Sequence, residues 1–499
     1  MSSAIPAPAP APAASPHPRA VVPVLAFCGM VVAVMQTLVV PLLPHVPDLT
    51  GASPGAAGWL VTITLLTGAV FTPVLGRVGD MYGKRRVLLA SLGVLTAGSA
   101  LCAVSSDIGV LITGRALQGA ALAVIPLGIS IIRDELPAER VLSSIALMSS
   151  TLGIGAAIGL PVAAVVIENF DWHTMFWASA ALGLLDLLLV LWIVPESAVR
   201  SRGSFDVLGT LGLTGSLVGL LLAITQGADW GWTSARTLGL LGASVVVGVL
   251  WGRYELRARS PMVDLRVSAR PAVLLTNVAA LLIGFAFYAN SLVTGQMVQE
   301  PTSTGYGLGA SIVVSGLCLL PGGLAMVALS PVSARISAAR GPRTALALAA
   351  VVMAVGYVVR FFTSHSLWLI VAGATVVASG TAIAYSALPA LVMRAVPVSE
   401  TAAANGLNTL MRSVGQACCS AVVAAVLAHV TFVADGRTAP TLHAYLLIFL
   451  IAAGAALAAL GATLFLPSDR PGAGATRGPG RTGGTVTVSA SATAARESA

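Results

Sequence analysis

Charged residues are scarce in this chain of 499 residues. Only 9% of its residues are Asp, Glu, Lys or Arg, and 57% are hydrophobic. Soluble proteins carry about 25% charged residues, so the chain lies far outside their range. The net charge of +8 does not by itself indicate nucleic acid, because the cytoplasmic loops of membrane proteins also collect cations. The composition excludes an ordinary soluble domain and indicates a membrane protein.

Cysteine and metal-site or catalytic motifs are also rare. The spacing of the five cysteines fits no metal site, and we interpret them as small buried hydrophobic residues. The sequence has no HExxH motif and no pair of acids within an apolar segment, which argues against a membrane-embedded enzyme. It has no repeated filter segment either, which argues against a channel. We expect no cofactor and no metal.

Long apolar runs take the place of the missing charges. A run of about 20 apolar residues is long enough to cross a bilayer as a helix. Fourteen such runs are found, at residues 21–43, 58–77, 87–104, 108–131, 142–167, 173–194, 206–225, 234–252, 271–298, 308–332, 343–362, 366–393, 401–430 and 441–466. The sequence therefore predicts an all-α polytopic membrane protein with fourteen transmembrane helices.

The distribution of arginine predicts how these helices are oriented. Most of the 27 cations fall in loops that share one side of the membrane if both termini are cytoplasmic, in agreement with the positive-inside rule. We therefore place both termini in the cytoplasm of a cell with the chain in its plasma membrane. The Pro/Ala-rich segment 1–20 and the Gly-, Ser-, Thr- and Arg-rich segment 468–499 are predicted to be disordered tails.

The segment GRVGDMYGKRR (residues 76–86) is the most unusual short stretch. Orientation alone accounts for cations in a cytoplasmic loop. It does not account for an aspartate among spaced glycines, which permit tight reversal and close helix contact. Asp80 can accept hydrogen bonds from a helix N-terminus or pair with a cation. We expect a conformational latch, defined here as Gly76, Gly79, Asp80, Gly83, Lys84 and Arg85.

This segment resembles the signature loop of the major facilitator superfamily, in which the loop stabilises the outward-open state. Arg115 and Gln118 resemble the second motif of the family, and Gly155, Gly159 and Pro161 resemble its antiporter motif. FDVLG (205–209), GADWGW (227–232) and the stretch 253–266 resemble the fourteen-span drug:proton antiporter branch. The resemblance implies the major facilitator fold, with two six-helix bundles and an inserted helix pair.

An internal repeat supports the same architecture. Aligning residue 76 with residue 334 without gaps sets GRVGDMYGKR over ARISAARGPR, and Ala338 takes the place of Asp80. Two related bundles separated by an insertion are typical of transporters. We predict an N-terminal bundle at 21–195, an inserted helix pair with its linkers at 196–270 and a C-terminal bundle at 271–467.

Polar residues within the spans are candidate sites, because they are costly in a bilayer. The proton-coupling candidates are Arg115, Asp186, the only acid deep within a span, and Glu168 at an outer helix end. Met35 stands where the branch carries its usual coupling aspartate. Each candidate has a structural alternative, such as an arginine that binds neighbouring carbonyl groups.

One polar stripe predicts a cavity. Asn405, Asn408, Arg412 and Gln416 share one helix face, although hydrogen bonds between helices would also explain them. The substrate-cavity candidates are Gln36, Gln118, Tyr288, Tyr385, Asn405, Asn408 and Arg412. Because three arginines and only one acid lie within the spans, we expect neutral or weakly anionic substrates to be preferred over dications.

These features lead to one functional hypothesis. The resemblance implies a monomeric exporter of amphiphilic small molecules that uses the proton gradient and alternating access, with membrane lipids, substrate and protons as its partners and no nucleic acid. An exporter of an endogenous product or metabolite with the same fold is the alternative. The sequence does not separate these two tasks.

Overall fold

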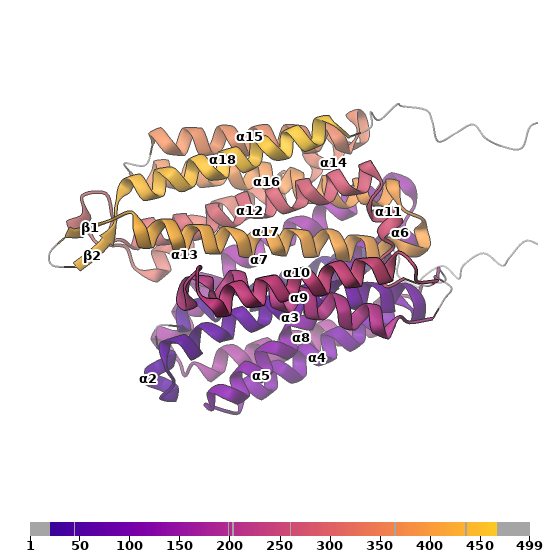
Figure 1. Ribbon diagram of the computed structural model, residues 1–499, viewed down its shortest axis with the longest axis horizontal. Helices are drawn as coiled ribbons and strands as arrows, with labels where there is room; N and C mark the ends of the chain where they lie inside the picture. Colours follow the sequence, from indigo (N-terminus) through magenta and orange to yellow (C-terminus); the bar gives the residue numbers. More distant parts are fainter. Residues whose placement is uncertain are drawn as a thin grey trace, which may run out of the picture. The chain divides into compact units, whose positions relative to one another are not determined.

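The structure is a computed structural model. It describes residues 20–466 except 44, 198, 202–203, 260, 364–365 and 435–436, and it does not describe the side chains of residues 54–55, 228–229, 434 and 437–438. The two predicted disordered tails therefore lie outside the described residues, apart from Ala20. Within the described part, long helices lie side by side along a common direction (Figure 1).

Thirteen of the described helical segments are long and apolar enough to cross a membrane, and a bent pair of helices supplies a fourteenth. The long helices are α1 (Val21–Thr37), α3 (Pro54–Tyr82), α4 (Lys84–Ala103), α5 (Ile108–Gln118) with α6 (Val124–Glu135), α7 (Ala138–Asn169), α8 (His173–Ile193), α9 (Val207–Trp230), α10 (Ala235–Glu255), α12 (Pro271–Gln299), α13 (Ile312–Ala328) with α14 (Ser330–Arg340), α15 (Pro342–Phe362), α16 (Leu367–Ala395), α17 (Thr401–His429) and α18 (Leu442–Leu464). The predicted all-α polytopic fold is confirmed, and the count of fourteen holds when α13 and α14, bent by 42°, form one span.

Several short elements were not predicted from the sequence. They are the helices α2 (Val46–Thr50) and α11 (Leu265–Ser268), the 3-10 turns η1 (Val40–Leu42), η2 (Gly119–Ala123), η3 (Thr302–Thr304) and η4 (Val398–Glu400), and the strands β1 (Thr431–Ala434) and β2 (Arg437–Pro440). The strands form an antiparallel hairpin in which Thr431 faces Pro440. Apolar periodicity gives no signal for pieces this short.

The loop predicted at residues 76–86 is corrected by the structure. Helix α3 continues through Asp80 to Tyr82, and α4 begins at Lys84. The reversal occurs at Gly83 alone, whose φ of +121° is open to glycine and rarely to other residues. Polar residues at the end of a span thus belong to the helices. Hydropathy could not show this, because it registers where apolar character stops rather than where hydrogen bonding stops.

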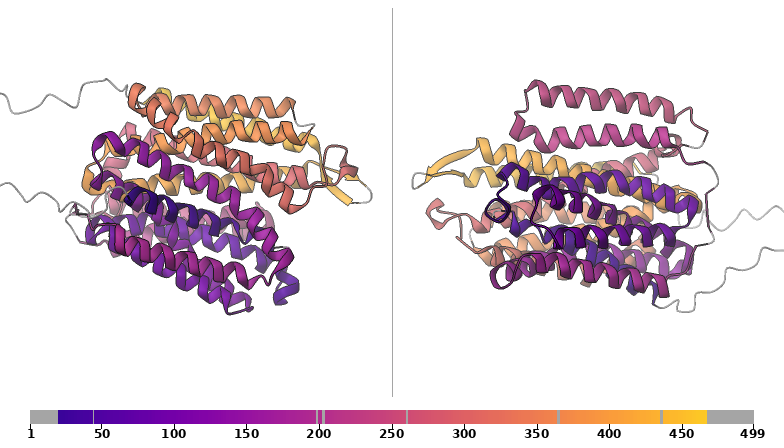
Figure 2. Two further views of the ribbon diagram at one scale, coloured as in Figure 1. Left: turned by 180° about the vertical axis from the view of Figure 1, so that it is seen from behind. Right: turned by 90° about the horizontal axis from the view of Figure 1, so that it is seen from below.

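The helices divide into two groups that follow the halves of the sequence. The indigo and purple helices of the first half and the orange and yellow helices of the second half occupy opposite sides of Figure 1. Helices α9 and α10 lie together at the edge of the bundle in the right-hand view of Figure 2, and α9 also packs on α3 and α17. This arrangement agrees with two bundles and an added helix pair.

Two seams join the halves, and glycines allow the close approach at both. In the first seam α3 packs against α17, where a Cβ on Gly76 would lie 2.7 Å from the Ala402 carbonyl oxygen. In the second seam α7 packs against α13, where a Cβ on Gly323 would lie 2.6 Å from the Ala157 Cβ. Larger residues at either glycine would separate the helices.

Candidate functional site

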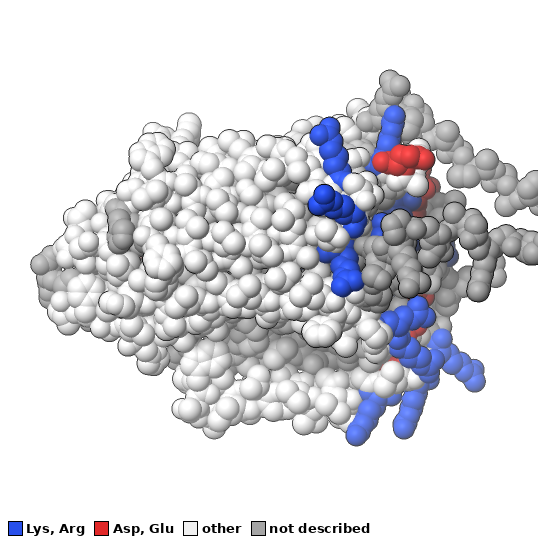
Figure 3. Space-filling view, turned by 90° about the horizontal axis from the view of Figure 1, so that it is seen from above, with Lys and Arg blue, Asp and Glu red and all other residues white. Residues whose placement is uncertain are grey.

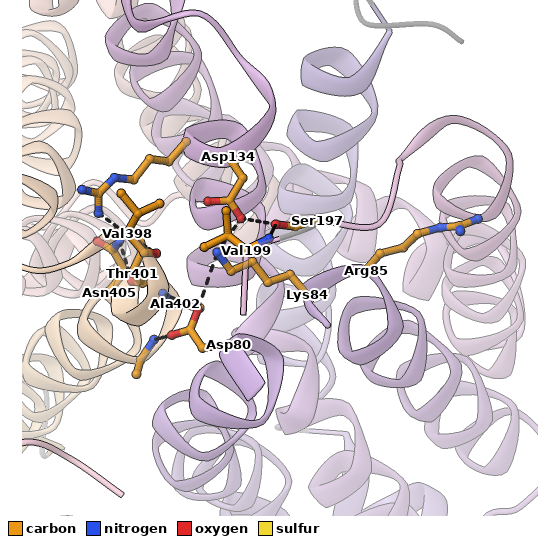
Figure 4. A network of polar contacts seen from close by, with 12 residues as sticks. Asp80, Lys84, Arg85, Asp134, Ser197, Val199, Val398, Thr401, Ala402 and Asn405 are labelled. Carbon is orange, nitrogen blue, oxygen red and sulfur yellow. Dashed lines mark hydrogen bonds and ion pairs between the residues drawn. The ribbon is translucent and has the colours of Figure 1, made fainter. Parts of the chain in front are cut away.

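The latch brings Asp80 of α3 to the N-terminus of α17. The carboxylate of Asp80 accepts hydrogen bonds from the backbone N–H groups of Ala402, at 3.3 Å, and Ala403, at 2.8 Å (Figure 4). These donors belong to the first turn of α17, where N–H groups lack intrahelical partners and the helix dipole favours a negative charge. A side chain of the first half thereby caps a helix of the second half.

A buried cation completes the latch. The Lys84 ammonium lies 3.6 Å from Asp80 and 2.6 Å from the Asp134 carboxylate, and both lysine and Asp80 side chains are fully buried. The Ser197 hydroxyl donates a second hydrogen bond to Asp134 at 2.5 Å. Removing one member of such a buried cluster leaves an uncompensated charge, which costs several kcal/mol. Asp134 was not among the candidates predicted from the sequence, although it lies in the RDE run that ends α6, beside the membrane.

Neighbouring contacts strengthen the same junction. Arg133 of α6 donates hydrogen bonds to the Thr401 hydroxyl at 2.5 Å and to the Val396 carbonyl oxygen at 3.4 Å. Arg85 donates to the Leu191 carbonyl oxygen at the end of α8 and, through its backbone N–H, to Glu196. Asp80 and Arg133 therefore bridge the two halves, whereas Arg85 ties α4 to the last helix of its own half.

Arg115 is buried and held by backbone carbonyl groups. Its guanidinium donates to the carbonyl oxygens of Leu60 at 3.0 Å and Met35 at 3.1 Å, and to the Gln118 side chain at 2.6 Å. A cavity of about 10 Å³, enough for about one water, lies between this group and Gln36. The structure thus brings Arg115, Gln118 and Gln36 together. The bonds to carbonyl groups fit the structural alternative for Arg115.

The predicted stripe on α17 faces other helices. Asn408 donates to the Asn277 side chain of α12 at 3.0 Å, and Asn405 donates to the Thr401 carbonyl oxygen at 3.0 Å. The Arg412 guanidinium lies 4.5 Å from the centre of the Tyr385 ring. All these side chains are buried. Asn408 and Arg412 therefore join α17 to α12 and α16, whereas the bond of Asn405 stays within α17.

Tyr288 and Gln416 differ from these residues because they line a larger cavity. Both line a cavity of about 140 Å³ bounded by α3, α9, α12 and α17. Three of the seven cavity candidates line one of these two cavities: Tyr288 the larger one, and Gln36 and Gln118 the small one beside Arg115. The other four line neither cavity; they are Tyr385, Asn405, Asn408 and Arg412.

The residues of the predicted antiporter motif hold α7 against two neighbours. A Cβ on Gly155 would lie 2.6 Å from the Met30 carbonyl oxygen of α1, and one on Gly159 would lie 2.0 Å from the Thr37 hydroxyl. Pro161 contacts α13, since a Cβ on Gly316 would lie 3.0 Å from its ring. The motif thus lies where α7 meets both α1 and the opposite half.

The two acidic candidates differ sharply in environment. Asp186 of α8 is fully buried, and neither of its oxygens has a hydrogen-bond partner of normal geometry among the described residues. The Cys28 thiol of α1 is the polar group beside it. Glu168 is exposed at the end of α7 and pairs with no other described residue. Nearby, hydrogen bonds from His173 hold the pKa of Asp171 below its usual value.

Comparison with known proteins identifies the family. The sequence profile of the Major Facilitator Superfamily matches residues 25–418 and, in a second match, residues 278–494. The chain belongs to the Major Facilitator Superfamily. Like the other transporters of this family, it is a multi-pass membrane protein, and the family is a class of transporters rather than enzymes.

Individual relatives of this major facilitator are named for drug resistance, transport or export. It is 27% identical over 404 residues to the multidrug resistance protein Stp of Mycobacterium tuberculosis, covering 80% of this chain and 74% of the relative. It is 26% identical over 379 residues to a probable actinorhodin transporter of Streptomyces coelicolor, with 73% and 64% covered. It is 27% identical over 315 residues to a tetracenomycin C resistance and export protein of Streptomyces glaucescens, with 63% and 57% covered.

A solved structure supports the fold of this major facilitator. The human organic anion transporter MFSD10 superposes with a TM-score of 0.65 at 17% identity, and the match covers 90% of this chain and all of that one. The bundle architecture described above is therefore that of the superfamily.

Proposed function

We propose that this protein is a secondary active exporter of amphiphilic small molecules that works by alternating access. The carrying observation is the bond between Asp80 and the first turn of α17, because it links the two halves at one end of the membrane region. A contact of this kind forms in one state and has to break in the other. The names of the relatives supply the substrate class, since they are multidrug resistance and antibiotic export proteins.

The latch end faces the cytoplasm in this proposal. Lys and Arg side chains gather at one end of the face shown in Figure 3, and the remainder of that face is free of them among the described residues. The positive-inside rule assigns such an end to the cytoplasm. Latch closure then corresponds to a state that is shut toward the cytoplasm.

Protons drive the transport in this proposal, with Asp186 as the proton-binding group. A buried carboxylate without a normal hydrogen-bond partner is far more costly as an anion than as a neutral acid, so it favours binding of a proton. One charge that moves through 100 mV supplies about 2.3 kcal/mol. Since each tenfold ratio requires about 1.4 kcal/mol, one proton supports about a fortyfold gradient of a neutral substrate.

Export of an endogenous product is the second candidate. The relatives named as a probable actinorhodin transporter and as a tetracenomycin C resistance and export protein favour it, because each name states one compound rather than many drugs. Both candidates use the same fold and the same latch. They differ only in the physiological substrate.

A sensitivity panel tests the proposal. The chain is expressed in a pump-deficient bacterial host and challenged with amphiphilic antibiotics and dyes, with and without a protonophore. We expect reduced sensitivity and lower dye accumulation that the protonophore abolishes. If the protein reaches its normal level in the membrane and the accumulation of every compound is unchanged, export is contradicted. If the protein lowers accumulation equally with and without the protonophore, proton coupling is contradicted. Metabolite accumulation in a deletion strain separates product export from drug efflux.

A further inference from the structure

The inserted helix α9 packs against α3 and α17, but a cavity remains beside part of it. Toward the latch end, Leu213, Leu217 and Leu221 of α9 form an apolar cluster with Leu66 of α3 and Leu410 of α17. A cavity of about 140 Å³ begins at Leu66 and Leu221 of this cluster and extends past Thr225, one turn further along α9, between α3, α9, α12 and α17.

No charged side chain among the described residues lines this cavity. Its walls are leucine, alanine and valine together with a few neutral polar groups, which include Thr62, Thr225, Tyr288, Gln416 and Ser420. A cation or anion placed here would lose its water without gaining a counter-charge, which costs several kcal/mol. Arg412, one helical turn from Gln416, adds a positive charge nearby that disfavours cations further.

The neutral polar groups divide into acceptors and donors. The hydroxyls of Thr62 and Thr225 donate to the carbonyl oxygens of Gly58 and Leu221 in their own helices. Their hydrogens are thereby used. The Tyr288 hydroxyl is held by no hydrogen bond to a described residue, and the Gln416 carboxamide, which also reaches Tyr385, has more than one N–H. The groups able to donate to a ligand are therefore Tyr288, Gln416 and Ser420, whose hydroxyl also makes no hydrogen bond to a described residue.

We propose that this cavity is a substrate site with the inserted helix α9 as one wall, and that it holds an uncharged planar ring that bears a carbonyl oxygen. The volume and the apolar walls suit one ring system of a larger amphiphile. The Tyr288 hydroxyl and the Gln416 amide donate to the carbonyl oxygen. This inference rests on the proposed export function, and it gives the helix pair a task in substrate recognition.

Two dyes of one ring system test the chemistry. Nile red is neutral and carries a ring carbonyl, whereas Nile blue is its cationic analogue. We expect energised cells or inverted vesicles that contain the protein to export Nile red at least fivefold faster than Nile blue. Export of Nile blue at an equal or higher rate overturns the assignment of an uncharged ligand.

Matched tryptophan variants on α9 test the place. Thr225→Trp fills the cavity, whereas Leu211→Trp adds the same ring on the same helix at a residue that is 63% exposed. We expect Thr225→Trp to slow Nile red export at least fivefold and Leu211→Trp to change it by less than twofold. Equal rates for both variants at equal membrane levels overturn the site.

A third variant avoids any doubt about folding. Tyr288→Phe removes only one hydroxyl, and we expect it to slow Nile red export about threefold without changing export of a hydrocarbon-rich dye that lacks a carbonyl.

If the wild type exports no dye, the export function itself fails. The cavity is then tested by Nile red fluorescence on purified protein in nanodiscs, where an enhancement that Thr225→Trp leaves intact overturns the site.

Discussion

The latch and its repeat in the second half share a glycine turn and the arginine that follows it, but Ala338 takes the place of Asp80. Gly83 ends α3 with a φ of +121°, and Gly341 ends α14 with a φ of +84°. Arg85 donates to the Leu191 carbonyl oxygen at the end of α8, and Arg343 donates to the Leu464 carbonyl oxygen at the end of α18, at 2.7 Å. Each half thus ties its turn to its own last helix in the same way.

The contact between the halves is where the two regions diverge. Asp80 is fully buried at the N-terminus of α17, whereas Ala338, its counterpart in the repeat, is exposed and has no polar side-chain group. The shared turn therefore maintains each bundle, and within the turn segment itself Asp80 adds the bond across the seam. The two seams are therefore held by different contacts. Charged groups hold the α3–α17 seam, and apolar packing holds the α7–α13 seam.

Asp80→Asn is expected to have the largest effect. The amide cannot accept from both backbone N–H groups as a carboxylate does, and Lys84 loses one of its two acids. Hydrogen bonds to a charged group contribute about 1.5–3 kcal/mol each, so we expect transport to fall by at least tenfold while the protein still inserts. Efflux is measured at matched membrane levels.

The repeat supplies the control for this variant. Ala338→Asn places the same side chain at the corresponding exposed position, and we expect less than a twofold change. Normal efflux by Asp80→Asn would show that the latch bond does not control transport. An equal loss in both variants would show that the two regions are not different in function.

Arg115→Ala is expected to rank second. The arginine holds α1 and α3 through the Met35 and Leu60 carbonyl oxygens, so its loss loosens the first bundle near a site that has to change shape. We expect the protein to accumulate in the membrane with about fivefold lower transport and an altered pH profile. Arg115→Lys should not rescue it, because an ammonium lacks the planar fork of donors. Failure to accumulate would instead assign Arg115 a purely structural role.

Gly76→Ala tests whether transport requires the close approach of α3 and α17 at the first seam. We expect a smaller effect on transport than for the two variants above. The added methyl group would lie 2.7 Å from the Ala402 carbonyl oxygen, so α3 and α17 have to move apart slightly. The second half already has Ala334 at the corresponding position. We expect a two- to fivefold loss of transport and a longer distance between spin labels at the latch ends of α3 and α17. An unchanged distance would show that α3 and α17 do not require a glycine at residue 76 for their close approach.

Much of the fold could be predicted because hydropathy and repeats are local properties of the sequence. The fourteen spans follow from residue type and spacing, and so do the two kinds of partner open to Asp80, a helix N-terminus or a cation, both of which the structure shows. The spaced glycines permit a reversal, but only the structure places it at Gly83. The bend between α13 and α14 gives no such signal, because α14 (SPVSARISAAR) is much more polar than α13 and hydropathy marks only the end of the apolar run. Asp134 as the partner of Lys84 could not be predicted either, because their contact depends on how α4 and α6 pack.

The candidate cavity was harder to predict than the fold. A polar stripe on α17 indicates only that a face avoids lipid, and the structure directs most of that face toward α12 and α16 instead of a cavity. Thr225 was not a candidate, because a single threonine in an apolar helix commonly bonds to its own backbone. Only the packing of the inserted helix against α3 and α17 brings it to the cavity wall.

Asp186→Asn is expected to have the smallest effect on the protein and the most specific effect on coupling. The substitution conserves shape in a buried site beside Cys28, so insertion and the latch should be unaffected. If Asp186 binds the transported proton, the variant loses the pH dependence of substrate uptake into inverted vesicles but keeps exchange down a substrate gradient.

Asp171→Asn is the control. The pKa of Asp171 is held below its usual value, so this exposed group stays ionised throughout the neutral range and takes up no proton there. We therefore expect the pH profile to change with Asp186→Asn and to stay the same with Asp171→Asn. A full proton-driven response in the Asp186 variant would assign coupling to another acid, and Glu168→Gln would be measured next.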